Sequence, residues 1–172
     1  MKIEVLGDAG ASARLAELIN EVYAVAEEGL WLDGTQRTTP DEVAGFVRDG
    51  EIVVARVDDE VVGCLRLQRL DEGTSEFGML AADPARRGLG IGRELVRFAE
   101  RTSHEQGRGT MQLEVLVPRE WTHPSKKFLT EWYTRIGYRV TRTGTIDEDY
   151  PHLAPLLARP CDFVIYHKDL AA

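Results

Sequence analysis

The chain has 172 residues, of which 43% are hydrophobic and 29% are charged, and its formal net charge is −8. This length suits one domain with a continuous core, so we expect a single domain over residues 1–172 in a protein of the soluble globular class. The acidic charge argues against a nucleic-acid-binding surface, because phosphate backbones require concentrated Lys and Arg.

Membrane, metal and disulfide chemistry are not predicted. No apolar run approaches the ~18 residues of a membrane span, and the first residues lack the apolar core of a signal peptide. We therefore expect a cytoplasmic protein. Cys64 and Cys161 are the only cysteines and have no partner motif, and the four histidines have no metal-ligand spacing.

The first predicted elements are a strand over residues 2–6 and an amphipathic helix that ends near Gly29. Apolar residues recur in that helix at the i, i+3, i+4, i+7, i+8 spacing, namely Leu15, Leu18, Ile19, Val22 and Tyr23. The following loop combines Glu27, Glu28 and Asp33 with Trp31. It either lines a substrate pocket or is an exposed turn anchored by its tryptophan.

A second helix and an antiparallel meander are predicted next. Thr39 is a typical N-cap, and Pro40 suits the first helical position. Two strands, 52–57 and 61–70, are separated by an Asp-Asp turn, and a third strand covers residues 76–82.

The third strand leads into a glycine-spaced loop, Arg87-Gly-Leu-Gly-Ile-Gly92, and then into a helix. Glycines at a helix start expose backbone N–H groups that have no internal partner, which predicts an anion cradle. A P-loop would need Lys-Ser or Lys-Thr after the last glycine, and a dinucleotide fingerprint would need a glycine at Arg93. Neither motif fits.

Segment 86–101 carries five arginines and two glutamates, a local positive excess. Arg93, Arg97 and Arg101 lie four residues apart. They either face an anionic ligand or form a solvated helix face.

The last third predicts a strand over 111–117, a helix from Ser125 that closes at Gly137, and strands over 138–143 and 162–167. The helix places its apolar residues on one side, namely Phe128, Leu129, Trp132, Tyr133 and Ile136. Residues 144–160 form an excursion longer than a hairpin needs, with three prolines and several apolar residues. We expect an ordered flap there.

The loop resembles the Arg-x-x-Gly-x-Gly signature of the GNAT superfamily of N-acetyltransferases, with Arg87, Gly90 and Gly92 in the signature positions. A second segment, Trp132-Tyr-Thr-Arg-Ile-Gly-Tyr138, is similar to the family's Leu-Tyr-Glu-Lys-Leu-Gly-Phe segment. The resemblance covers roughly residues 40–168. It implies an α/β GNAT fold: a mixed sheet of about seven strands, splayed between the fourth and fifth, with about four flanking helices.

The resemblance also implies acetyl-CoA as the co-substrate, with no metal. The pyrophosphate is expected on the loop residues Arg87, Gly88, Leu89, Gly90, Ile91 and Gly92. The pantetheine arm is expected on the strand residues Leu80, Ala81 and Ala82. Lys126 stands where many members have a pantetheine-binding asparagine; Lys126 and Lys127 either contact the cofactor phosphates or are solvated.

Acetyl transfer to an amine requires that the amine lose a proton and that the departing thiolate, whose parent thiol has a pKa of about 8.5, gain one. Tyr133 lies on the family's tyrosine and is the predicted proton donor; its alternative role is in the core. Glu76 is the first candidate for the base, because the family often places a carboxylate on this strand. Glu114 is the second, and either carboxylate could instead lie on the rim.

The predicted function is N-acetylation of a primary amine on a small cationic molecule, since negative charge attracts cations. Acidic loop residues (Glu27, Glu28, Asp33, Asp147, Glu148 and Asp149) are pocket candidates, as are Glu120, Trp121 and His123. Alternatives are a protein N-terminal or lysine acetyltransferase, favoured by an open groove, and a non-catalytic acyl-CoA-binding module. We expect a monomer or homodimer without nucleic-acid or membrane partners.

Overall fold

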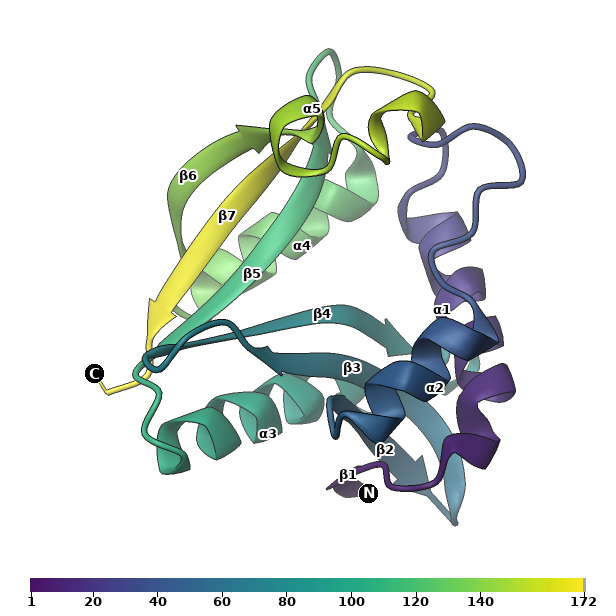
Figure 1. Cartoon of the computed structure of the whole chain (residues 1–172), viewed down its shortest axis with the longest axis vertical. Coiled ribbons are helices and arrows are strands. Elements are labelled where there is room, and N and C mark those ends of the chain that lie inside the picture. Colours follow the sequence, from purple (N-terminus) through teal and green to yellow (C-terminus); the bar gives the residue numbers. More distant parts are fainter. Residues whose placement is uncertain (172) are drawn as a thin grey trace.

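The computed structural model describes residues 1–171 and is built around one sheet of seven strands in the order β1-β2-β3-β4-β5-β7-β6 (Figure 1). The strands are β1 (Lys2–Val5), β2 (Ile52–Val57), β3 (Glu60–Arg69), β4 (Thr74–Ala82), β5 (Thr110–Pro118), β6 (Arg139–Thr145) and β7 (Cys161–Asp169). Neighbouring strands are antiparallel except β4 and β5, which are parallel. The predicted α/β fold with a mixed sheet is confirmed.

Helices connect these strands. They are α1 (Ser12–Ala26), α2 (Pro40–Arg48), α3 (Ile91–Glu105), α4 (Pro124–Arg135) and the single turn α5 (Ile146–Asp149), with short 3-10 turns at Ala9–Ala11, Pro84–Arg86 and Ala154–Leu156. Thr39 caps α2, because its hydroxyl accepts a hydrogen bond from the Glu42 amide at 3.1 Å. α1 ends before Gly29, whose φ of +83° belongs to the turn beyond the helix.

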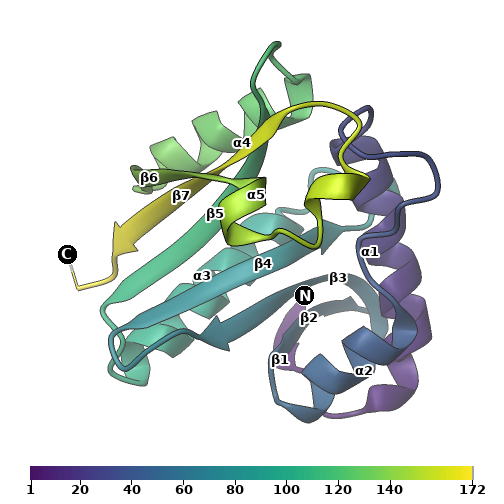
Figure 2. The same ribbon diagram turned by 45° about the horizontal axis from the view of Figure 1, so that its top comes forward.

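The helices cover the two faces of the sheet (Figures 1 and 2). α1 and α2 bury Leu15 and Val43 against one face, and α3 buries Leu95 against the other. A Cβ atom at Gly63 of β3 would lie 2.5 Å from Cγ2 of Ile91. The bare glycine therefore lets the first turn of α3 sit directly on the sheet, which fixes the start of this helix.

β4 and β5 splay apart (Figure 1). They pair only at Thr74↔Thr110, Ser75↔Met111 and Glu76↔Gln112, whereas β5 pairs with β7 along its whole length. Beyond Glu76, the edge of β4 that faces β5 has no strand partner. The predicted splay of the fourth and fifth strands is confirmed.

The excursion 144–160 is an ordered flap that is attached to the loop after α1. Trp31 and Leu157 form an antiparallel bridge, and the amide of Leu32 donates to the carbonyl of Leu156 at 2.8 Å. Beneath this contact, Leu30 packs in a small buried cluster that includes Ile146 of the flap. The flap thus closes one end of the space between the splayed strands.

Candidate active site

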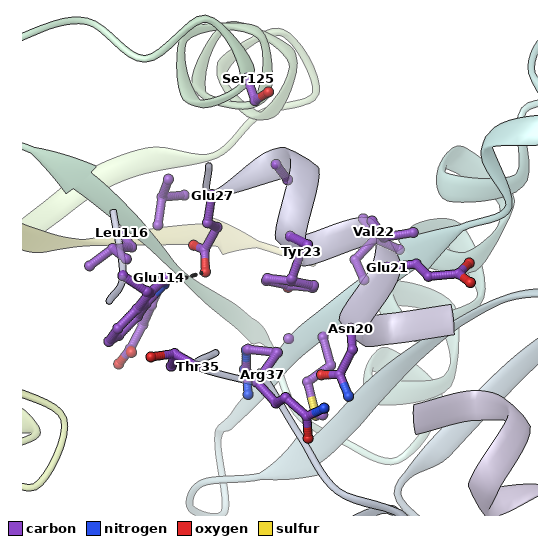
Figure 3. A pocket seen from close by; sticks show the side chains of 18 of the residues that line it. Asn20, Glu21, Val22, Tyr23, Glu27, Thr35, Arg37, Glu114, Leu116 and Ser125 are labelled. Carbon is purple, nitrogen blue, oxygen red and sulfur yellow. Dashed lines mark hydrogen bonds between the residues drawn. The ribbon is translucent and has the colours of Figure 1, made fainter. Parts of the chain in front are cut away.

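A cavity of about 1780 Å³ lies between the arms of the splayed sheet. Its walls come from α1, the loop after it, β4, β5, α4 and the flap. Figure 3 shows Tyr23 of α1 and Glu27, which directly follows α1, projecting into the space that Glu114 and Leu116 of β5 also face. Cavities that hold a single drug-sized ligand usually measure about 300–1,000 Å³, so this one has room for an extended cofactor arm and an acceptor together.

The glycine-spaced loop is the candidate anion-binding site, and of its residues Arg87 lines the cavity, whereas Gly88, Leu89, Gly90, Ile91 and Gly92 are not among the lining residues. Gly90 is the N-cap of α3, with a left-handed φ of +71°, and makes no side-chain cap. The first amides of α3 therefore remain free for an external anion, and the helix dipole favours negative charge there. Arg87 lines the cavity, whereas Arg86 is held by an ion pair with Glu60. These features fit a pyrophosphate.

β4 presents backbone groups to the gap. The Asp83 amide donates to the Val62 carbonyl at 2.8 Å, and Ala81 is in register with Cys64. Because backbone groups alternate along a strand, those of Ala82 and Leu80 point toward β5. Ala81 points its backbone toward β3, and its side chain is buried beside α1 and α2. Leu80 and Ala82 are therefore the strand residues placed to pair with an extended ligand.

A bulge reorients β4 next to this edge. Met79 has a φ of +51°, and the β3–β4 register shifts at this point. A left-handed non-glycine residue stores about 1–3 kcal/mol of strain, which is most often found at functional sites. The sequence gives no signal for this bulge, because Met has no preference for that conformation.

Tyr133 lines the cavity from α4 and is almost fully buried. Its ring packs against Phe77, Trp132 and Tyr138, with centroid separations of 5.0 to 6.1 Å. Within residues 1–171 its hydroxyl has no hydrogen-bond partner. Burial raises the pKa of Tyr133, and the nearby Tyr23 adds to this shift. The phenol is therefore neutral and can donate a hydrogen bond into the cavity.

Glu76 lies where β4 and β5 part. Its two carboxylate oxygens accept hydrogen bonds from the side-chain amides of Gln68, at 2.9 Å, and Gln112, at 2.6 Å. The Gln112 side chain is itself in contact with His167. The two amide donors hold the carboxylate in a fixed orientation.

Glu114 lines the same cavity and lies on β5, two residues after Gln112. Burial raises the pKa of Glu114, and the charges of Glu76 and Asp149 raise it further, whereas the hydrogen bond from Tyr150 lowers it. Within residues 1–171, neither Glu76 nor Glu114 forms an ion pair with Lys or Arg. The two carboxylates therefore add negative charge to a lining that also includes Arg37, Arg66 and Arg87.

Lys126 does not serve as a phosphate ligand in this structure. Its Nζ atom lies 2.6 Å from Oε2 of Glu27, and both side chains are buried. The other Glu27 oxygen accepts a hydrogen bond from the Trp31 indole at 3.0 Å. Lys127 is exposed.

The remaining pocket candidates divide into two groups. Those from the loop after α1 line the cavity, namely Glu27, Glu28 and Asp33, whereas the flap residues Asp147, Glu148 and Asp149 and the loop residues Glu120, Trp121 and His123 are not among its lining residues. His123 instead caps α4, because its Nδ1 atom accepts a hydrogen bond from the Ser125 amide.

Three further residues line the cavity that the sequence did not indicate as site residues, namely Tyr23, Arg37 and Tyr150. The Arg37 guanidinium lies 5.2 Å from the centre of the Tyr23 ring. A signal existed for Tyr23, since it lies one helical turn before Glu27 and shares its face of α1. Tyr150 had none beyond its place in the flap.

The sequence model of the acetyltransferase (GNAT) domain family matches residues 48–140. The chain belongs to the GNAT acetyltransferase family. The match includes β4, the glycine-spaced loop, α3, β5 and Tyr133. The predicted family and acyltransferase class are thereby confirmed, and the uncapped start of α3 beside Arg87 fits acetyl-CoA as the co-substrate.

Solved GNAT structures share the fold. The aminoglycoside 6'-N-acetyltransferase from Enterococcus faecium is 17% identical, with a TM-score of 0.70 over 99% of this chain and 97% of that one. Rv2747 from Mycobacterium tuberculosis, solved with CoA, is 18% identical, with a TM-score of 0.65 over 98% of this chain and 99% of that one.

A third solved relative is much longer than this chain. N-acetylglutamate synthase from Neisseria gonorrhoeae, solved with coenzyme A, is 17% identical, with a TM-score of 0.67 over 98% of this chain, which spans only 35% of the synthase. No curated protein matches by sequence.

Two further observations concern the described residues. No helix in residues 1–171 is long and apolar enough to cross a membrane. The same residues contain no group of three or more His, Cys, Asp or Glu side chains arranged to hold a metal ion.

Proposed function

We propose that this GNAT protein transfers the acetyl group of acetyl-CoA to a primary amine on a small cationic molecule. The observation that carries the proposal is the set of charged groups in and next to the cavity. Arg87 lines it and adjoins the uncapped start of α3, and Glu76 and Glu114 line it without an ion-pair partner in the described chain. Such groups would attract an anionic cofactor to the loop and a cationic acceptor to the carboxylates.

The bound thioester supplies an activated acetyl group. The residues of the chain then have three tasks: Leu80 and Ala82 offer backbone groups that orient the cofactor arm and polarise its carbonyl, a carboxylate removes the amine proton, and Tyr133 protonates the sulfur. One C–N bond forms as one C–S bond breaks, and a proton passes from nitrogen to the base while another passes from Tyr133 to the thiolate.

The contacts support different roles for the two carboxylates. Both oxygens of Glu76 already accept amide hydrogen bonds, which favours a fixed carboxylate that attracts the ammonium. The raised pKa of Glu114 brings it closer to neutral pH, which suits a general base. The sequence ranked Glu76 first as the base; we assign proton removal to Glu114 and cation attraction to Glu76.

The roof of the cavity supports a small acceptor over a protein substrate. The flap and the loop after α1 are joined by backbone hydrogen bonds on both sides of the Trp31–Leu157 bridge, including one of 2.9 Å from Ala158 to Leu30. An extended peptide would need this roof to open. The E. faecium neighbour is named for acetylation of an aminoglycoside, which is a small molecule.

The test is an acetyl-CoA-dependent thiol-release assay with small diamines, aminosugars, neutral amino acids, and a peptide with a free N-terminus and a lysine. We expect release with the cationic small amines and little with the peptide. A preference for the peptide would indicate a protein acetyltransferase. Coenzyme binding without release for any acceptor would indicate a binding module.

A further inference from the structure

Tyr150 reaches Glu114 from the flap. Its hydroxyl donates a hydrogen bond of 2.6 Å to Oε2 of Glu114, 36 residues earlier in the chain. Within residues 1–171 the other oxygen, Oε1, has no hydrogen-bond partner. One side of the carboxylate is therefore held by the flap, and the other remains available inside the cavity.

The position of Tyr150 is fixed by its surroundings. Its ring packs edge-on against Phe163 of β7, with a centroid separation of 4.8 Å. The preceding residue, Asp149, lies against the bare backbone of Gly144 and pairs with Arg142 at 3.4 Å. Anchors on β6 and β7 therefore hold the phenol over Glu114.

The charged and titratable groups around Glu114 come from several elements. Glu76 faces it from β4, Asp149 and Tyr150 from the flap, and Arg142 from β6. Burial and the Glu114 charge both raise the pKa of Tyr150, so the phenol stays a hydrogen-bond donor through the neutral range. Among these neighbours, Tyr150 is the one that makes a direct hydrogen bond to the carboxylate.

We propose that Tyr150 is a positioning residue for acetyl transfer, which holds the Glu114 carboxylate by one oxygen and turns the other toward the acceptor amine. The proposal rests on the proposed function, in which Glu114 is the base. It also links the flap to the chemistry, because the residue that orients the base belongs to the roof of the cavity.

Tyr150→Phe keeps the ring and removes only the hydroxyl. A hydrogen bond donated to a carboxylate stabilises its ionised form, so its loss raises the pKa of Glu114. The acid limb of the kcat/KM profile should move to higher pH by roughly one unit, with the KM for acetyl-CoA unchanged. Tyr166→Phe is the matched control, because Tyr166 is a buried tyrosine of β7 outside the cavity lining.

A second readout does not depend on activity. The side-chain carboxyl carbon of Glu114 is titrated by NMR in the resting protein, and Glu114→Gln identifies its signal. An upward shift of the Glu114 pKa in Tyr150→Phe, absent in Tyr166→Phe, supports the proposal. An unmoved titration overturns it, as does an unmoved acid limb in an active enzyme. A wild-type protein without acceptor-dependent turnover contradicts the proposed function instead.

Discussion

The Nζ atom of Lys126 lies 2.6 Å from Oε2 of Glu27, and the exposed fractions of the two side chains are only 6% and 7%. Lys126 belongs to α4, which packs on β5, and Glu27 directly follows α1, which packs on β4. The ion pair therefore ties together the two arms of the splayed sheet. It lies in the cavity wall, on the same face of α4 as Tyr133.

Lys126→Met should destabilise the protein by about 3–5 kcal/mol, because it leaves a buried carboxylate with no cation. The double variant Lys126→Met/Glu27→Gln removes both charges and should recover most of that loss. Urea unfolding at neutral pH measures the free energy of each variant. A single variant as stable as the wild type, or a double variant that is no better than the single one, would show that the pair does not hold the arms together.

Glu114 should make the stability of the protein depend on pH. Its pKa is raised in the folded state, so its contribution is fully present below the unfolded-state pKa of about 4.3 and is lost as the pH rises through the folded value. Glu114→Gln removes this dependence and should gain stability relative to the wild type between pH 4 and 7. The exposed Glu105 gives the matched control Glu105→Gln.

Urea unfolding of the wild type and both variants at several pH values measures this effect. If the difference between the wild type and Glu114→Gln stays constant across that range, the carboxyl is not perturbed by its surroundings. The case for Glu114 as the base would then weaken.

Tyr133→Phe should lower kcat by about 10²- to 10⁴-fold, because the departing thiolate loses its proton donor. The Kd for acetyl-CoA should remain the same, since the ring and its packing are retained. Steady-state kinetics and calorimetry together separate these effects, with Tyr166→Phe as the control. Unchanged turnover would leave Tyr133 a core residue of α4.

Much of the fold could be predicted because it is encoded locally. The Thr39 cap, the 3.6-residue spacing around Leu15 and the glycines around Gly90 each specify their own segment of backbone. The splay of β4 and β5 has no local cause and came from the family resemblance.

The parts of the site that the sequence did not predict depend on contacts between residues far apart in the chain. Lys126 and Glu27 are 99 positions apart, and Tyr150 and Glu114 are 36 apart. One clue to the first pair was present: Lys126 lies three and seven residues before Leu129 and Tyr133, on the buried face of a helix. A lysine there requires a buried partner, but helical spacing cannot name it.

Gly90→Ala should weaken acetyl-CoA binding. Its φ of +71° is unfavourable for alanine by about 1–2 kcal/mol, and relief of that strain would turn the loop amides away from the pyrophosphate. Gly107→Ala is the matched control, because Gly107 has a φ of +84° just beyond the other end of α3. Both variants should lose similar stability, but only Gly90→Ala should lose affinity.

Calorimetric titration of acetyl-CoA into the folded wild-type protein tests the central claim most directly. We predict saturable binding at one site, retained in Gly107→Ala and strongly weakened in Gly90→Ala. Absence of binding by the wild type, or equal affinity in both glycine variants, would contradict the assignment of the loop as the cofactor site.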